Sequence, residues 1–421
     1  AMENKGLNIF NSKYVLASPE TATDEDYMNI QGVIGHEYFH NWTGNRVTLK
    51  NWFQLSLKEG LTVFRDQEFS SDLNSRAVKR ISCVKNLRAF QFPEDAGPMA
   101  HPVRPESYIK MDNFYTMTVY EKGAELIRMI HQLIGEQAFQ KGIKLYFERF
   151  DGMAVTIEDF VKAMADASDR CLDQFRLWYS QSGTPTVTMK RSYDPSKNTL
   201  ILDFEQKTAP DRNQETKKPL HIPIRFGLLD AEGKDAGLND RPLLELKKTK
   251  ERFSFKGMGP KTYPSIFRQF SAPVKIETDY SEKDLAFLMA HDNDEFNRWD
   301  ASQTLFKNEI KHLVSAWQKN QELVVSTELI QAFGTALKDT RTDRAFIARA
   351  LALPPETEIK DLYDLIDVKA IHEARAYLKL TLSRKFKDLF LDTLELCSQS
   401  KPDSLSQKAC ADRSLKNLAL S

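Results

Sequence analysis

Two histidines lie four residues apart in the segment His36-Glu37-Tyr38-Phe39-His40. On a helix such residues are about 40° from eclipsed, so both imidazoles can bind one metal ion from the same face. The carboxylate of Glu37 would then lie beside the metal rather than on it. This placement suits a general base, because zinc lowers the pKa of its water toward about 7 and a nearby carboxylate can take the proton.

A catalytic zinc site needs a third protein ligand besides the two histidines. Eighteen residues separate His40 from Glu59, which lies in a second segment with helical spacing. A helix packed against the first could therefore supply this carboxylate. A glycine and a third histidine at fixed offsets would indicate another type of zinc site, but Thr43 and Arg46 occupy those positions. We predict one Zn²⁺ per chain, bound by His36, His40 and Glu59.

Two alternatives to this zinc site remain open. His36 and His40 could be ordinary polar positions of a helix, since HExxH patterns also occur by chance. The ion could also be cobalt or manganese, because a site of two histidines and one glutamate accepts several divalent ions.

Helices are expected to position these side chains. Apolar residues recur at helical spacing from Thr23 to about Trp42, with acidic residues in the first turn. Further helices are predicted from Leu57 to Phe69 and from about Thr118 to Ile134. The stretch 94–108 between them contains three prolines and is predicted to be a loop.

The remainder of the 421 residues indicates two further domains. After residue 183, runs of β-branched and aromatic residues alternate with turn signals, which predicts a small β-sandwich at residues 184–280. From residue 281 to 421 apolar positions recur three and four apart, which predicts an α-helical array. With the helical residues 1–183, the fold class is multidomain and mainly α.

Composition limits the possible partners and locations. The 59 basic and 59 acidic side chains cancel, so nucleic acid is not expected as a partner. The four cysteines form no CxxC pair, which favours a reducing, cytoplasmic setting, in solution or peripheral to the inner membrane. No apolar stretch approaches the roughly 20 residues of a transmembrane segment. A monomer is expected.

Longer strings in the sequence carry a resemblance to a known family. They are AMEN at residues 1–4, HEYFH at 36–40, KEG at 58–60 and VYEKGAE at 119–125. Together they resemble the aminopeptidase N family of gluzincin zinc peptidases, in particular its bacterial branch. The likeness continues through AGPMAHPVRP, WYSQSGTP and HDNDEFNRWDA. It implies a thermolysin-like α(+β) catalytic domain and a metalloaminopeptidase of the membrane alanyl aminopeptidase type, acting on peptides with a free N-terminus.

The resemblance also implies roles for individual residues. Ala1, Met2, Glu3 and Asn4 match the family's GAMEN exopeptidase signature without its first glycine, so they are expected to bind substrate. A fixed carboxylate at Glu3 could bind the cationic α-amino group and position the first peptide bond. Tyr120 matches the family's transition-state tyrosine, which donates to the oxyanion. Read alone, Glu3 could be a surface residue and Tyr120 a buried helix aromatic.

Two further side chains are candidates with open alternatives. Tyr115 could line the pocket for the first side chain of the substrate, or pack in the core. Asp66, seven residues after Glu59 on the same helix face, could orient a metal ligand, or serve as a cap or surface residue.

The sequence departs from the family pattern in its length and at one position of the motif. Family members carry an N-terminal β-domain before the signature and a longer helical domain at the end, so the sequence is expected to be a fragment. Lys58 replaces the asparagine of the wider family, as the bacterial branch allows.

The alternatives to an aminopeptidase are an endopeptidase or epoxide hydrolase on the same scaffold, or an inactive or substrate-binding remnant.

Overall fold

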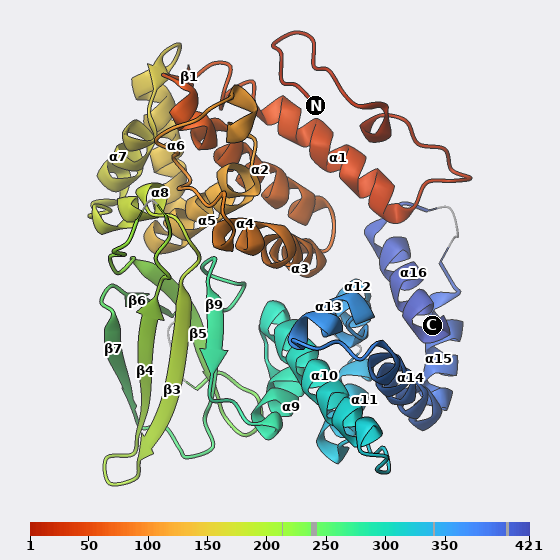
Figure 1. The fold of residues 1–421 in the computed structure, drawn as a ribbon. Coiled ribbons are helices and arrows are strands. Elements are labelled where there is room, and N and C mark those ends of the chain that lie inside the picture. The colour runs from red at the N-terminus through yellow and green to blue at the C-terminus, as the bar shows by residue number, and fades with distance from the viewer. Residues whose placement is uncertain (213, 237–241, 340–341, 401–403) are drawn as a thin grey trace. The chain divides into compact units, whose positions relative to one another are not determined.

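The computed structural model describes residues 1–421 except 213, 237–241, 340–341 and 401–403. They divide into two compact units. The first comprises residues 1–226, 238–260 and 266–279, and the second comprises residues 227–237, 261–265 and 280–421. Along the chain, helices are followed by strands and again by helices (Figure 1), in agreement with the predicted fold class.

The first 180 residues are mainly helical. Their α-helices are α1 (Asp24–Phe39), α2 (Leu55–Leu73), α3 (Arg76–Asn86), α4 (Phe92–Ala96), α5 (Gly123–Ile134), α6 (Glu136–Phe150), α7 (Ile157–Ser168) and α8 (Leu177–Ser180). Short 3-10 helices are η1 (Ser12–Tyr14), η2 (Trp52–Gln54), η4 (Met111–Phe114) and η6 (Gln174–Arg176), and π-helices are η3 (Leu87–Gln91) and η5 (Thr118–Lys122). Strands β1 (Thr48–Leu49) and β2 (Ala154–Val155) pair in parallel.

The predicted helices are present with shifted ends. Helix α1 begins after Thr23, because the Thr23 hydroxyl accepts from the Asp26 backbone N–H and the Asp26 carboxylate accepts from the Thr23 N–H. It ends at Phe39 rather than Trp42. The loop prediction for residues 94–108 is wrong at its start, which belongs to α4. Pro93 stands in the first turn of that helix, which follows the π-helix η3 directly.

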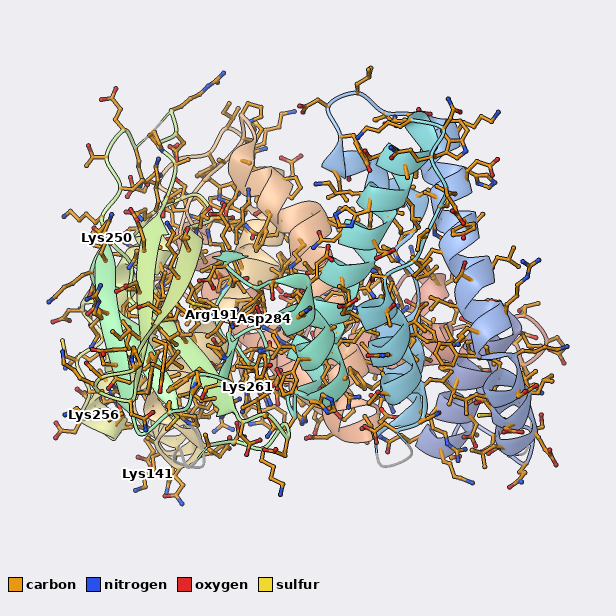
Figure 2. The ribbon with its side chains drawn as sticks, turned by 90° about the horizontal axis from the view of Figure 1, so that it is seen from below. Lys141, Arg191, Lys250, Lys256, Lys261 and Asp284 are labelled. Atoms are coloured by element: carbon orange, nitrogen blue, oxygen red, sulfur yellow. The ribbon has the colours of Figure 1, made fainter. Side chains whose placement is uncertain are left out.

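Two β-sheets follow, one of four strands and one of three. The strands are β3 (Thr186–Asp194), β4 (Thr199–Lys207), β5 (Ile222–Leu229), β6 (Leu243–Leu246), β7 (Lys250–Lys256), β8 (Tyr263–Ile266) and β9 (Lys275–Thr278), in the orders β7-β4-β3-β9 and β6-β5-β8. The Phe226 ring of one sheet packs on the Phe255 ring of the other, with centroids 5.2 Å apart. Exposed Lys250 and Lys256 stand at the two ends of the edge strand β7 (Figure 2), where charge discourages pairing with another chain.

The second unit is built mainly from helices. They are α9 (Glu282–His291), α10 (Glu295–Gln318), α11 (Thr327–Leu337), α12 (Arg344–Leu351), α13 (Glu356–Ile359), η7 (Lys360–Leu362), α14 (Val368–Lys385), α15 (Lys387–Cys397) and α16 (Gln407–Leu420). Among the helices of the described residues, none has both the length and the apolar character needed to cross a bilayer.

Candidate metal centre

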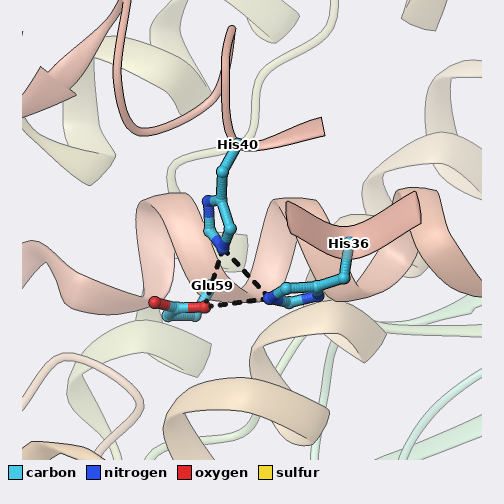
Figure 3. Close-up of side chains that lie close together, drawn as sticks. All are labelled: His36, His40 and Glu59. Carbon is cyan, nitrogen blue, oxygen red and sulfur yellow. Dashed lines mark hydrogen bonds and ion pairs between the residues drawn. The ribbon is translucent and has the colours of Figure 1, made fainter. Parts of the chain in front are cut away.

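Helices α1 and α2 bring the three predicted metal ligands together (Figure 3). The Nε2 atoms of His36 and His40 lie 3.0 Å apart, and Glu59 Oε2 lies 3.4 and 3.2 Å from them. Four ligands at the usual zinc distances form a tetrahedron with edges of about 3.3 Å. The three donor atoms therefore have the spacing of one face of a zinc tetrahedron, and all three residues line one cleft.

Small residues let the two helices approach this closely. A Cβ atom on Gly35 would lie 2.9 Å from the Phe69 ring, and one on Gly32 would lie 3.3 Å from Ser70 Oγ. Gly35 directly precedes His36, so this close approach of the two helices lies beside one of the predicted metal ligands. Glycine at these positions therefore lets α1 and α2 pack closely.

Both histidines are held by their second ring nitrogen. His36 Nδ1 lies 2.7 Å from Asp66 Oδ2, and His40 Nδ1 lies 3.0 Å from the carbonyl oxygen of Thr43. An Nδ1–H that donates to these acceptors leaves Nε2 unprotonated and directed at the metal position. Asp66 thus lies where an orienting residue would be expected.

The charge around the histidines favours a cation. The carboxylates of Asp66 and Glu59 raise the pKa of His36 to about 10, although burial opposes this. Burial also opposes ionisation of Glu59, but hydrogen bonds from the two histidines and the charge of Lys58 hold its pKa well below the ordinary value. The site thus attracts positive charge at the point where the three donors converge, and these residues fit a divalent metal ion.

Glu37 is the predicted base and lies beside this point. Its side chain is buried, its Oε2 atom has no hydrogen-bond partner among the described residues, and burial raises its pKa. Carboxylate oxygens of Glu37 and Glu3 lie within 4.8 Å of each other and of a His40 ring nitrogen. A buried acceptor without a partner is costly, so this oxygen is placed for a water or substrate group.

Tyr120 reaches the site from the π-helix η5. Burial, together with the negative charge of Glu59, raises the pKa of its hydroxyl, so it stays a protonated donor. A Cβ atom on Gly60 would lie 2.7 Å from the backbone of Gly123, so α2 and the start of α5 are in close contact. The Ser56 hydroxyl donates to the Val119 carbonyl at 2.8 Å and satisfies an acceptor of the π-helix.

A cleft of about 780 Å³ opens over the metal position. Ala1, Met2 and Glu3 line it, whereas Asn4 is not among its lining residues. Tyr115 also lines it and is 45% exposed, so it is not a core residue. Its ring centroid lies 6.2 Å from that of Tyr120.

Two residues of the site carry no predicted role. Lys58 donates to Glu59 at 2.5 Å and also to Glu3, a contact across 55 positions that spacing does not predict. Glu121 lines the cleft beside Tyr120, and burial raises its pKa to about 7. Its position directly after Tyr120 is the only sequence signal that could have pointed to it.

Three known domain families match successive parts of the chain. Residues 1–179 match the peptidase family M1 domain, residues 183–279 match a domain of unknown function with an Ig-like fold, and residues 282–421 match one with ARM repeats. This agrees with the predicted peptidase domain, β-sandwich and helical array.

Similar proteins include aminopeptidase N of Escherichia coli, 51% identical over all of this chain and 49% of the relative. Aminopeptidase N of Haemophilus influenzae is 50% identical over 93% of this chain and 46% of the relative. The chain thus spans about half the length of the curated relatives it matches. Legionella pneumophila aminopeptidase A, solved in complex with aspartic acid, superposes with a TM-score of 0.83 and 28% identity, over 99% of this chain and 47% of that one. Residues 1–179 thus form a peptidase family M1 domain, and the chain is similar over its whole length to bacterial aminopeptidase N.

Proposed function

We propose that this chain carries the catalytic centre of a zinc aminopeptidase, which hydrolyses the first peptide bond of peptides with a free N-terminus. The observation that carries the proposal is the set of three donor atoms at zinc spacing. Beside them lies a carboxylate oxygen of Glu37 that has no hydrogen-bond partner among the described residues. Zinc, when bound by His36, His40 and Glu59, supplies a water of lowered pKa and polarises the scissile carbonyl.

The other residues of the cleft then have distinct tasks. Glu37 accepts the proton of the attacking water and later passes it to the leaving amine. The Tyr120 hydroxyl donates to the oxyanion that forms at the carbonyl, a contribution of about 3 kcal/mol. Glu3 receives the α-ammonium group, and Tyr115 forms part of the wall around the first side chain.

The relatives support the substrate class, since aminopeptidase N and aminopeptidase A are named for removal of N-terminal residues. Because the chain spans about half of these relatives, the activity of the whole protein is part of the proposal.

Hydrolysis of alanyl and leucyl anilides by the zinc-loaded chain tests the proposal. We expect release of the chromophore, loss of turnover in Glu37→Ala with zinc still bound, and no cleavage of the N-acetylated anilides. The exposed Glu148→Ala is the matched control and should keep full activity.

Other outcomes would favour the alternatives. Cleavage of the acetylated substrate would indicate an endopeptidase, and turnover of an epoxide alone would indicate an epoxide hydrolase. A zinc-loaded chain that binds leucine but cleaves nothing would indicate a substrate-binding remnant.

A further inference from the structure

Lys58 lies between two carboxylates of the cleft. It precedes Glu59 on α2, and its side chain is 13% exposed. Its ammonium group donates to Oε1 of Glu59 at 2.5 Å and to Oε1 of Glu3. One cation is therefore shared between a metal ligand and the residue proposed to bind the substrate amine.

This contact occupies one oxygen of each carboxylate and leaves the other oxygen for a different partner. In Glu59, Oε2 faces the histidines at 3.2 and 3.4 Å, while Oε1 is turned to Lys58. In Glu3, Oε1 is bound by Lys58, which leaves Oε2 for another donor. The backbone carbonyl of Glu3 also accepts from the Asn45 amide at 2.7 Å, so the residue is held at two points.

We propose that Lys58 is a positioning residue that ties the carboxylate of Glu3 to Glu59, and so fixes the distance between the amine-binding oxygen and the metal position. The inference rests on the proposed function, in which Glu3 binds the α-ammonium group. Without a shared cation the carboxylates of Glu3, Glu37 and Glu59 repel one another, and the Glu3 side chain loses the hydrogen bond that directs it. Lys58 thereby restricts the cleft to ligands whose amine belongs to the same residue as the carbonyl at the metal position.

Binding of leucine and of its des-amino analogue 4-methylpentanoate to the zinc-loaded chain tests this inference by calorimetry, without any turnover. The wild-type protein should prefer leucine. Lys58→Met and Lys58→Gln should each lose about tenfold or more of that preference, the usual effect of one charge-assisted hydrogen bond. The glutamine can still donate to Glu59 and so preserve its orientation. Lys141→Met, at an exposed helix lysine labelled in Figure 2, is the matched control and should change nothing.

The Glu3→Gln variant separates this inference from the proposed function. If Glu3→Gln loses the leucine preference while either zinc-loaded Lys58 variant keeps it, Lys58 does not position Glu3 and the inference is overturned. If neither Lys58 variant binds zinc, Lys58 acts on the metal ligand alone, which also overturns it. A wild-type protein without leucine preference would overturn the amine-binding role of Glu3 and the inference with it, whereas anilide turnover tests the hydrolase separately.

Discussion

At the metal centre, each proposed ligand makes a second contact through an atom that does not face the metal position. His36 is held by Asp66, His40 by a backbone carbonyl, and Glu59 by Lys58. Ligands held in this way lose little freedom when an ion binds. The strength of zinc binding should therefore depend on residues that never contact the ion.

Asp66→Ala should weaken zinc binding by about 10- to 100-fold, because His36 loses the acceptor that orients its ring. Zinc dissociation constants from competition with a chelating dye would measure the change. Asp72→Ala removes an exposed aspartate from the same helix and should leave the constant unaltered. Equal constants for wild type and Asp66→Ala would mean that the 2.7 Å contact has no role in metal binding.

Sequence spacing could predict that the three proposed ligands lie together, but not the contacts that hold them. His36, His40 and Glu59 follow from helix geometry, since two of them share one helix face and the third lies on the next helix. The contact of Lys58 with Glu3 spans 55 positions and depends on how the N-terminal segment folds over α2. No local periodicity encodes such a contact.

At the scale of elements, the contact between α2 and α5 positions the tyrosine. Gly60 and Gly123 meet where η5 passes into α5, and Ser56 caps the π-helix carbonyl of Val119. The helix over residues 118–134 could be predicted from its apolar spacing. Its π-helical first turn could not, because it depends on residues of α2 that are 63 positions away.

Gly60→Ala should move η5 away from α2, because the new Cβ would lie 2.7 Å from the backbone of Gly123. We expect kcat for alanyl anilide to fall at least about tenfold, since the Tyr120 hydroxyl would lose its alignment with the oxyanion. Zinc binding should persist. The control is Gly259→Ala, where a Cβ would meet no atom of the described part of the chain within 4 Å. Full activity in Gly60→Ala would show that the helix contact does not position Tyr120.

A buried ion pair links the same π-helix to α4 and to the residues that precede β3. Lys122 donates to Asp95 at 2.7 Å and to the Gly183 carbonyl at 3.0 Å, and Thr184 donates to Asp95 at 2.9 Å. Burial opposes ionisation of Asp95, but the charge of Lys122 and its hydrogen bond lower the pKa below the ordinary value. The carboxylate is thus ionised in the folded protein at neutral pH.

Asp95→Ala should lower the free energy of unfolding by about 3 kcal/mol or more at pH 7, because Lys122 is left buried without its counter-charge. A depressed pKa contributes stability above the unfolded value, near pH 4, and this is lost as pH falls through the folded value. The difference between wild type and variant in urea unfolding should therefore shrink below pH 4. Asp95→Asn combined with Lys122→Met should recover part of the loss. A difference that grows in acid would contradict this assignment.

For the whole molecule, the metal centre lies entirely in the first of the two compact units. The division into helical, β and helical parts could be predicted, since periodicity changes sharply near residues 183 and 281. The grouping of residues 227–237 and 261–265 with the C-terminal helices could not, because strand-like spacing does not tell which neighbours a strand segment packs against.

Zinc should therefore stabilise the first unit selectively. An ion that binds only the folded site adds about 4 kcal/mol at a thousandfold excess over its dissociation constant. For a unit of this size the corresponding rise in Tm is on the order of 10 °C. Scanning calorimetry with saturating zinc and with a chelator should show one transition that moves and one that does not, and His40→Ala should abolish the shift. If zinc moves the entire heat-absorption profile together, the two units unfold as one, and the metal centre then stabilises the C-terminal helices as well as its own helices.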